Sequence, residues 1–236
     1  MMHDSLTGLM RLLEFTDSAF PVGTFSFSNG LETAAATGEV FDSRSLGEYA
    51  RDVARRSATT DCVAALCAHR GCRAGDYAAV TEADEALWLC KLNTEARLMT
   101  QRMGHKMAEL ACRILNDNAV WRSFGSRWTS DIADGRVRGT HPVTAGILFA
   151  ACGLSEQELF CSLWYGALNT VLSAALRCVR VSHYDTQRLL FELGSEAGDL
   201  YYEAAAMELG DMNAFSPQAD ILASLHEKGN RRMFMN

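Results

Sequence analysis

Apolar residues recur at helical spacing along most of the chain. Strict alternation of apolar and polar residues, which is typical of a half-buried strand, is almost confined to residues 25–28. The chain has three prolines, at positions 21, 142 and 217, and each falls where other signals also place an element boundary. Long segments therefore remain free to form helices. We predict an all-α fold, a multi-helix bundle in which residues 1–236 form a single domain.

The pattern also gives approximate helix boundaries. We expect helices at about residues 5–15, 31–37, 45–56, 61–70, 81–116 in one or two pieces, from 140 onward, 155–179, 185–209 and after 217. The first of these places four apolar residues on one face: Leu6, Leu9, Met10 and Leu13. Thr140 is the expected cap of its helix, and Ser155 with Glu158 forms a capping box. Residues 121–128 fit no single pattern, and residues 130–139 are predicted to be a polar loop.

One helix is apolar enough to raise the question of a membrane. Residues 159–176 carry no charge, and this length is at the lower limit for a transmembrane span. Polar side chains lie within the segment, among them Tyr165 and Asn169, and two glutamates stand just before it. A helix buried in a soluble core explains these features better, so we expect no membrane association.

Composition limits the possible partners and the compartment. Hydrophobic residues make up 48% of the 236, enough for a sizeable core, and the net charge is -7. Nucleic-acid binding is disfavoured because it normally requires a basic patch, whereas an acidic surface suits a basic protein partner or a cation. The eight cysteines lie mostly in surroundings rich in alanine and leucine, typical of buried thiols. The N-terminus lacks a signal-peptide pattern, so we predict reduced thiols and a cytoplasmic protein.

The segment from Phe20 to Glu32 is the most specific motif of the chain. Pro21 fixes one backbone angle, while Gly23 and Gly30 can reach conformations that other residues avoid. Aromatic and hydroxyl side chains alternate between them: Phe25, Ser26, Phe27 and Ser28. The alternation directs two aromatics one way and two hydroxyls the other. A loop specified so closely indicates a functional role.

This segment resembles the N-terminal signature of the urease accessory protein F family, in which a similar run follows the first helix. Further matches occur in the same order along most of the chain: His141-Pro142-Val143 with Gly146, residues 168–177 ending in Arg177, Gln187, Ser216-Pro217, His226-Glu227 and Arg232-Met233-Phe234. The chain departs from the family pattern at residues 181–183 and in the tail. It therefore resembles a divergent member.

The resemblance implies a non-enzymatic maturation factor for urease, an all-helical homodimer. Its implied partners are the D (or H) scaffold protein, the G-type GTPase that carries nickel, and the urease apoprotein. Nickel would be in transit through the assembly and GTP would be bound by the partner, so we expect no cofactor on this chain. The implied partner-binding residues are Pro21, Gly23, Phe25, Ser26, Ser28, Gly30, Glu32, Arg177, Gln187, His226, Arg232 and Phe234.

The residues themselves leave several roles open. Glu32 is either a first-turn helix stabiliser or a contact to a basic partner, and the resemblance favours the contact. His226 is either structural or positions the tail. The tail, residues 228–236, is basic and then apolar, and we predict that it orders against a partner. Deleting residues 232–236 is then expected to abolish scaffold binding while leaving helicity intact.

Candidate metal chemistry is weak. No phosphate-binding loop is present, so the chain is not expected to bind GTP. The densest cluster of metal-ligand residue types lacks the spacing of structural zinc sites, and core thiols are the favoured interpretation: it comprises Cys62, Cys67, His69 and Cys72. His183 is a weak candidate nickel ligand, with a surface or capping role favoured.

Methionines at positions 99, 103 and 107 form a packing stripe that suits either the core or a dimer interface. Two alternative functions remain at this stage. One is a helical metal-binding regulator built on the cysteine cluster. The other is an uncharacterised helical enzyme that uses the His141 and His183 regions, although the sequence offers neither a nucleophile–base arrangement nor a cofactor motif for it.

Overall fold

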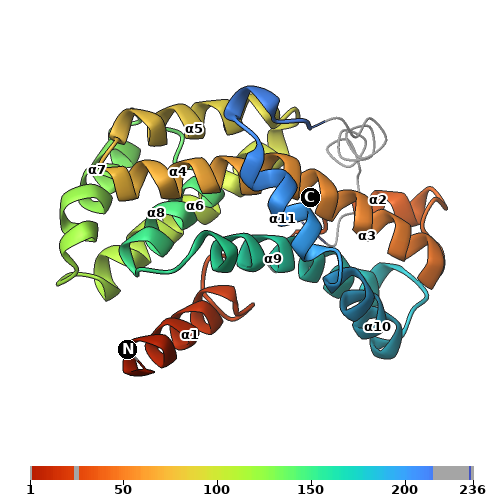
Figure 1. The fold of residues 1–236 in the computed structure, drawn as a ribbon. Helices are drawn as coiled ribbons and strands as arrows, with labels where there is room; N and C mark the ends of the chain where they lie inside the picture. The colour runs from red at the N-terminus through yellow and green to blue at the C-terminus, as the bar shows by residue number, and fades with distance from the viewer. Residues whose placement is uncertain (1, 24–26, 215–233, 235–236) are drawn as a thin grey trace.

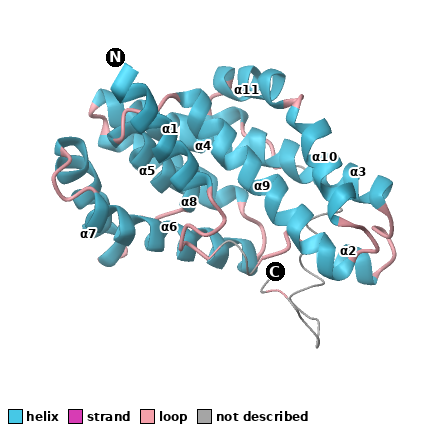
Figure 2. Cartoon of the chain, turned by 90° about the horizontal axis from the view of Figure 1, so that it is seen from below, coloured by secondary structure: helices cyan, strands magenta, loops and turns pink. Residues whose placement is uncertain are grey.

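The computed structural model describes residues 2–23, 27–214 and 234, and within these ranges every regular element is helical. The α-helices are α1 Met2–Thr16, α2 Leu31–Ala36, α3 Ser43–Ser57, α4 Val63–Ala74, α5 Tyr77–Cys90, α6 Thr94–Ile114, α7 Ser126–Ala133, α8 His141–Ala151, α9 Glu156–Cys178, α10 His183–Gly194 and α11 Ala197–Ala206. Figures 1 and 2 show helices joined by loops throughout the described chain. The all-α prediction is confirmed.

The core is built around α4, α8 and α9. All residues of α8 from Pro142 to Ala151 are buried, and most of α4 is buried beside it. The two helices approach closely at Gly146, where a Cβ atom would lie 2.5 Å from the carbonyl oxygen of Ala65. A larger residue would push these helices apart, so this glycine sets the spacing between them.

Helix α9 occupies the centre of the bundle, with α1 below it and α4 and α5 above it in Figure 1. It packs against α3, α2, α10 and α1. It is the helix that is long and apolar enough to cross a membrane, judged by length and composition among the described residues, and 44% of its apolar window is buried inside the bundle. Its first turn has the predicted capping box: the Ser155 amide donates to Glu158 (2.6 Å), and the Glu158 amide donates to Ser155 (3.3 Å).

Several predicted helix boundaries are wrong. The break expected between residues 56 and 61 does not occur, because a π-helical turn, Ala58–Cys62, joins α3 to α4 without interruption. The 121–128 segment is helical, through a π-helical turn, Trp121–Gly125, followed by α7. Helix α7 continues to Ala133, so the polar loop is shorter than predicted. The helix expected after Pro217 lies outside the described residues.

Two long predicted helices are each divided. The 81–116 segment, expected in one or two pieces, is split into α5 and α6, because Asn93 caps α6 by accepting from the amide of Ala96 at 2.7 Å. The 185–209 segment is split into α10 and α11 at Ser195 and Glu196, and α11 ends at Ala206. The second break contains no proline and keeps right-handed backbone angles at Ser195 and Glu196, which is why the sequence pattern does not reveal the bend between α10 and α11.

The start of α8 is held by a buried carboxylate. Asp84 of α5 accepts hydrogen bonds from the amides of Arg138, Gly139 and Thr140 at 2.7–2.9 Å, and from the Thr140 hydroxyl at 2.6 Å. Thr140 occupies the predicted N-cap position, but its hydroxyl points to Asp84 and makes no capping bond to α8. Asp84 therefore fixes the position of His141, the first residue of α8.

Candidate partner-binding site

The signature segment leads from α1 into α2 through a strained turn. Asn29 and Gly30 both adopt left-handed backbone conformations, with φ of 54° and 81°. The Tyr49 hydroxyl of α3 donates to the Asn29 carbonyl at 2.6 Å, and burial raises the pKa of Tyr49. Gly23, with φ of 90°, also uses the conformation that favours glycine. These contacts hold the turn in one shape and direct the first residues of α2.

The predicted separation of aromatic and hydroxyl side chains is not what the described part of the loop shows. Phe27 is 6% exposed and Ser28 is fully buried, so both neighbours point into the protein. Gly30 is buried, whereas Pro21 and Gly23 are exposed. Phe25 and Ser26 lie outside the described residues. The left-handed turn that follows at Asn29 breaks the regular alternation on which the prediction depends.

Three of the predicted partner-binding residues meet although they are far apart in the sequence. The Phe234 amide donates to a carboxylate oxygen of Glu32 at 3.1 Å, and the Arg177 guanidinium lies 5.2 Å from the centre of the Phe234 ring. Phe234 is 5% exposed, so its ring is buried against its own chain. We call Glu32, Arg177 and Phe234 the tail-anchor cluster. It joins the first turn of α2, the last turn of α9 and the C-terminal tail.

The other predicted residues are not part of this cluster. Gln187 is exposed on the outer side of α10, and His183 is exposed at the first position of the same helix. His226 and Arg232 lie outside the described residues. The structure therefore brings the signature segment, the end of α9 and the tail together, and leaves Gln187 outside this cluster.

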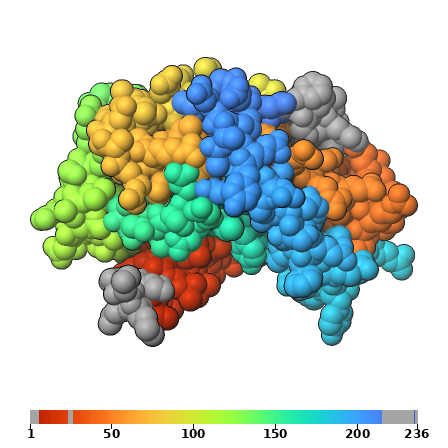
Figure 3. Space-filling model, in the orientation of Figure 1, coloured from red at the N-terminus to blue at the C-terminus, as the bar shows by residue number. Residues whose placement is uncertain are grey.

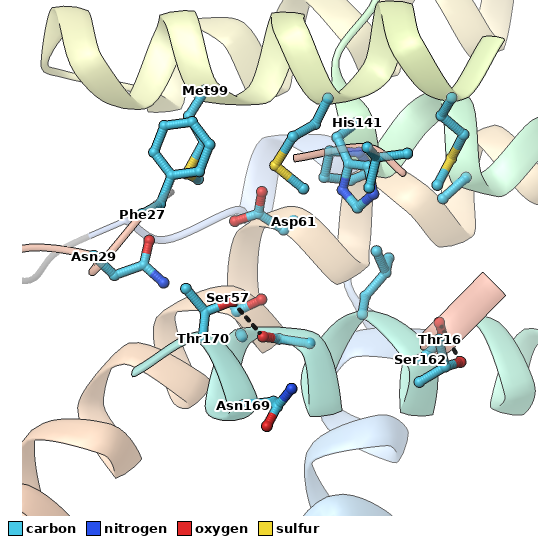
Figure 4. A pocket seen from close by; sticks show the side chains of 18 of the residues that line it. Thr16, Phe27, Asn29, Ser57, Asp61, Met99, His141, Ser162, Asn169 and Thr170 are labelled. Carbon is cyan, nitrogen blue, oxygen red and sulfur yellow. Dashed lines mark hydrogen bonds between the residues drawn. The ribbon is translucent and has the colours of Figure 1, made fainter. Parts of the chain in front are cut away.

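Residues of the signature segment also line a cavity of about 210 Å³ (Figure 4). Phe27 and Asn29 line one end of it, and the hydrogen bond between the hydroxyls of Thr16 and Ser162 (2.8 Å) lies at the other. The predicted methionine stripe forms part of its wall: Met99, Met103 and Met107. Met103 and Met107 are buried in the chain's own core, as one of the two interpretations of the stripe predicts.

Three polar groups of the cavity wall, Asp61, Lys91 and His141, are paired or neutral. Lys91 donates to both carboxylate oxygens of Asp61 at 2.7 Å. Burial works against the charge of Asp61, but the Lys91 ammonium outweighs it and lowers the pKa of this carboxyl. Desolvation lowers the pKa of His141 to about 4, so its imidazole is neutral at physiological pH. Because Asp61 is paired with Lys91, it is not a free carboxylate for acid–base chemistry with His141.

The cysteine cluster is built into the core. Cys62 and Cys72 are buried, and burial raises the pKa of both thiols, to about 11 for Cys72. The buried His69 uses Nε2 to contact the carbonyl oxygen of Leu154 at 2.9 Å. Within the described chain, no group of three or more histidine, cysteine or acidic residues is arranged to hold a metal ion. These thiols pack as small hydrophobic groups.

Sequence reasoning did not find the buried groups that position the site. Asp61 and Lys91 are 30 residues apart, and Asp84 meets residues more than 50 positions away. Acidic residues on helices are usually solvated, so nothing in the local pattern distinguishes these. Only the tertiary structure shows that Lys91 and Asp84 are buried and that Asp61 is half-buried beside Lys91.

Within its described part the chain is all-helical, and Glu32, Arg177 and Phe234 bring three of its family motifs together. Comparisons with known proteins identify its class. The model of the UreF family matches residues 40–194. Urease accessory protein UreF 1 of Brucella melitensis biotype 1 is 44% identical over 234 residues, covering 99% of this chain and 95% of that protein.

Two further relatives give the same result. UreF 2 of Brucella abortus strain 2308 is 44% identical, covering 99% of this chain and 94% of that protein. UreF of Yersinia pseudotuberculosis serotype I is 37% identical over 228 residues, covering 97% of this chain and 98% of that protein. The chain belongs to the UreF family of urease accessory proteins. Members of this family are accessory proteins and not enzymes, so the enzyme alternative is set aside.

Proposed function

We propose that this chain is a cytoplasmic urease maturation factor that bridges the D/H scaffold protein and the G-type nickel GTPase. In this role it regulates GTP-dependent assembly of the urease nickel centre and acts as a homodimer. Nickel and GTP are handled by its partners, and the chain contributes binding surfaces. The proposal rests first on membership of the UreF family.

The tail-anchor cluster supports the proposal with one structural observation. It brings the signature segment, the end of the central helix and the tail to a single place, through the contacts of Phe234 with Glu32 and Arg177. A surface composed of three distant segments depends on the folded state of all of them. A partner that binds there would bind only the folded form of this chain, and it would contact the tail.

The first test is urease activity and nickel content in cells that express the cognate urease operon with and without this gene. We expect inactive, nickel-poor urease without the gene and full recovery when the gene is restored. Fully active and nickel-loaded urease without the gene would contradict the proposal.

Point variants then test the cluster. Glu32→Ala and Arg177→Ala are expected to lower the nickel content of urease without changing the helicity of this chain, because both side chains belong to the tail-anchor cluster. Arg44→Ala is the matched control, since Arg44 is an exposed arginine with an ion pair to Glu48 on α3. Equal nickel content in all three variants would remove the cluster from the proposed binding surface.

A pull-down tests the tail. The chain lacking residues 232–236 is expected to lose the scaffold protein while retaining its circular dichroism spectrum. Retention of the scaffold by this truncated chain would show that the tail is not needed for the bridge.

A further inference from the structure

Helices α10 and α11 carry three large aromatic side chains that bury almost nothing. Tyr184, Phe191 and Tyr202 are 88%, 86% and 74% exposed. Exposed aromatics of this size are uncommon on a surface that has no partner, and Tyr and Phe are enriched at protein interfaces. Of the three, only Tyr202 makes a ring contact with another described residue, Tyr201, at 5.4 Å between ring centroids, and most of its surface stays exposed.

The three aromatics form one stripe. Phe191 lies seven residues after Tyr184, which is about two helical turns. Tyr202 lies eighteen residues after Tyr184, which is about five turns. Ser195 and Glu196, between the two helices, keep right-handed backbone angles, so the helical phase is nearly maintained across the bend. Leu189, Leu193 and Leu200 occupy the opposite side and are buried. The stripe therefore faces directly away from the core.

Carboxylates follow the same stripe. Each aromatic is followed in the sequence by an acidic residue: Asp185, Glu192 and Glu203. Residues 183–214 contain seven acidic residues and one arginine, so this segment holds six of the chain's seven net negative charges. Figure 3 shows α10 and α11, in blue, as a continuous band on the face toward the viewer.

Ion pairs among the residues that the structure describes neutralise part of this charge. Arg188 lies 4.0 Å from Asp185 and 3.9 Å from Glu192. From α3, Arg51 pairs with Glu196 at 2.9 Å and Arg55 lies 3.9 Å from Glu203. After these two arginines are counted, four net negative charges remain on residues 183–214. One of the acidic residues, Asp199, is exposed and lies three positions before Tyr202.

We propose that Tyr184, Phe191 and Tyr202, with the acidic residues beside them, form a docking surface for an arginine- and lysine-rich segment of a protein partner. Guanidinium and ammonium groups pair with carboxylates and also lie favourably over aromatic faces, so one cationic segment satisfies both parts of the stripe. A second copy of this chain would present the same negative charge. Nucleic acids and anionic lipid surfaces are excluded by the same sign.

The inference deepens the proposed function, because it assigns the chemistry of one partner surface, and Gln187 lies on this outer side of α10. Its test needs no urease and no accessory protein. Failure of the gene to support urease maturation would therefore leave the result of this test unaffected, and the two proposals can fail separately.

The test is a fluorescence anisotropy titration of the full chain with a labelled amphipathic peptide of arginine and leucine, and with its glutamate and leucine counterpart. We expect the arginine peptide to bind and the glutamate peptide not to bind. The triple variant Tyr184→Ser, Phe191→Ser, Tyr202→Ser is expected to raise the Kd about tenfold, as is the double variant Asp199→Lys, Glu203→Lys.

Phe41→Ser is the matched control, because Phe41 is a 64% exposed aromatic outside α10 and α11, and the Kd of this variant is expected to be unchanged. Circular dichroism should give wild-type helicity for all variants, since the replaced side chains are exposed. Equal Kd values for all variants would overturn the proposal by showing that binding is unspecific. Self-association of the wild type that the triple variant loses, measured by sedimentation, would overturn it in favour of a second copy.

Discussion

Gly146 shows how much one atom can matter in this core. A Cβ atom there would lie 2.5 Å from the Ala65 carbonyl oxygen and 3.1 Å from the Ala68 side chain. We expect Gly146→Ala to lower the free energy of unfolding by about 1–3 kcal/mol, through strain between α4 and α8. The measurement is urea denaturation.

The control is Gly166→Ala within α9, where an added Cβ atom meets nothing within 4 Å. Because alanine favours the helix over glycine, this variant should be more stable than wild type by about 0.5–1 kcal/mol. A loss of stability in both variants would mean that helix α9, and not the α4–α8 contact, limits stability.

His141 gives the protein a pH-dependent stability. Desolvation lowers its pKa from 6.5 to about 4 in the folded chain. Between these values the unfolded chain binds more protons than the folded chain, so stability falls as pH falls from about 6.5 to about 4. We expect a contribution of about 1–3 kcal/mol, seen as a flatter pH dependence of unfolding in His141→Gln. A pH dependence as steep in His141→Gln as in the wild type would contradict this prediction.

Among the helices, α1 shows that an apolar face need not be buried. The apolar face that the sequence predicts is present, but it is exposed: Leu6, Leu9, Met10 and Leu13 are 49–65% exposed. Phe15, near the end of the same helix, is 6% exposed, with its ring 5.6 Å from Phe20 and 5.8 Å from Phe149. The other side of the helix packs on the bundle, with Gly8 beside Leu154, Leu12 partly buried and Phe15 buried near the last turn.

This geometry predicts opposite results for two neighbouring substitutions. Leu13→Gln should change the free energy of unfolding by less than about 0.5 kcal/mol, because its side chain is 56% exposed. Phe15→Ala should cost about 3–5 kcal/mol, because it removes a packed ring. Thermal unfolding followed by circular dichroism compares the two, and a large loss in Leu13→Gln would show that its face is covered in solution.

The elements also show which sequence signals were reliable. The capping box at Ser155 and the short helix α2 before Gly38 are local features, and they were predicted closely. The sequence pattern does not reveal that α3 continues into α4. The shift in apolar spacing at the π-helical turn, Ala58–Cys62, resembles the end of one helix and the start of another. The break at Asn93 was visible only as a possible division, since asparagine both caps helices and occurs within them.

At the scale of the whole molecule, the tail returns to the signature segment. Phe234→Ala is expected to lower the free energy of unfolding by about 1.5–3 kcal/mol, because a buried ring is lost. Phe191→Ala, at an exposed ring, should change it by less than about 0.5 kcal/mol. Chemical denaturation measures both, and equal stability of the two variants would show that the tail contact contributes nothing to the fold.

Local patterns in the sequence are sufficient for the fold class and the family motifs. Helical periodicity, capping residues and the Phe20–Glu32 motif are local, so they can be detected without coordinates. The tertiary structure decided which residues are buried and which meet. Glu32, Arg177 and Phe234 come together, and three aromatics of α10 and α11 remain outside, because burial depends on packing between helices that are distant in the chain.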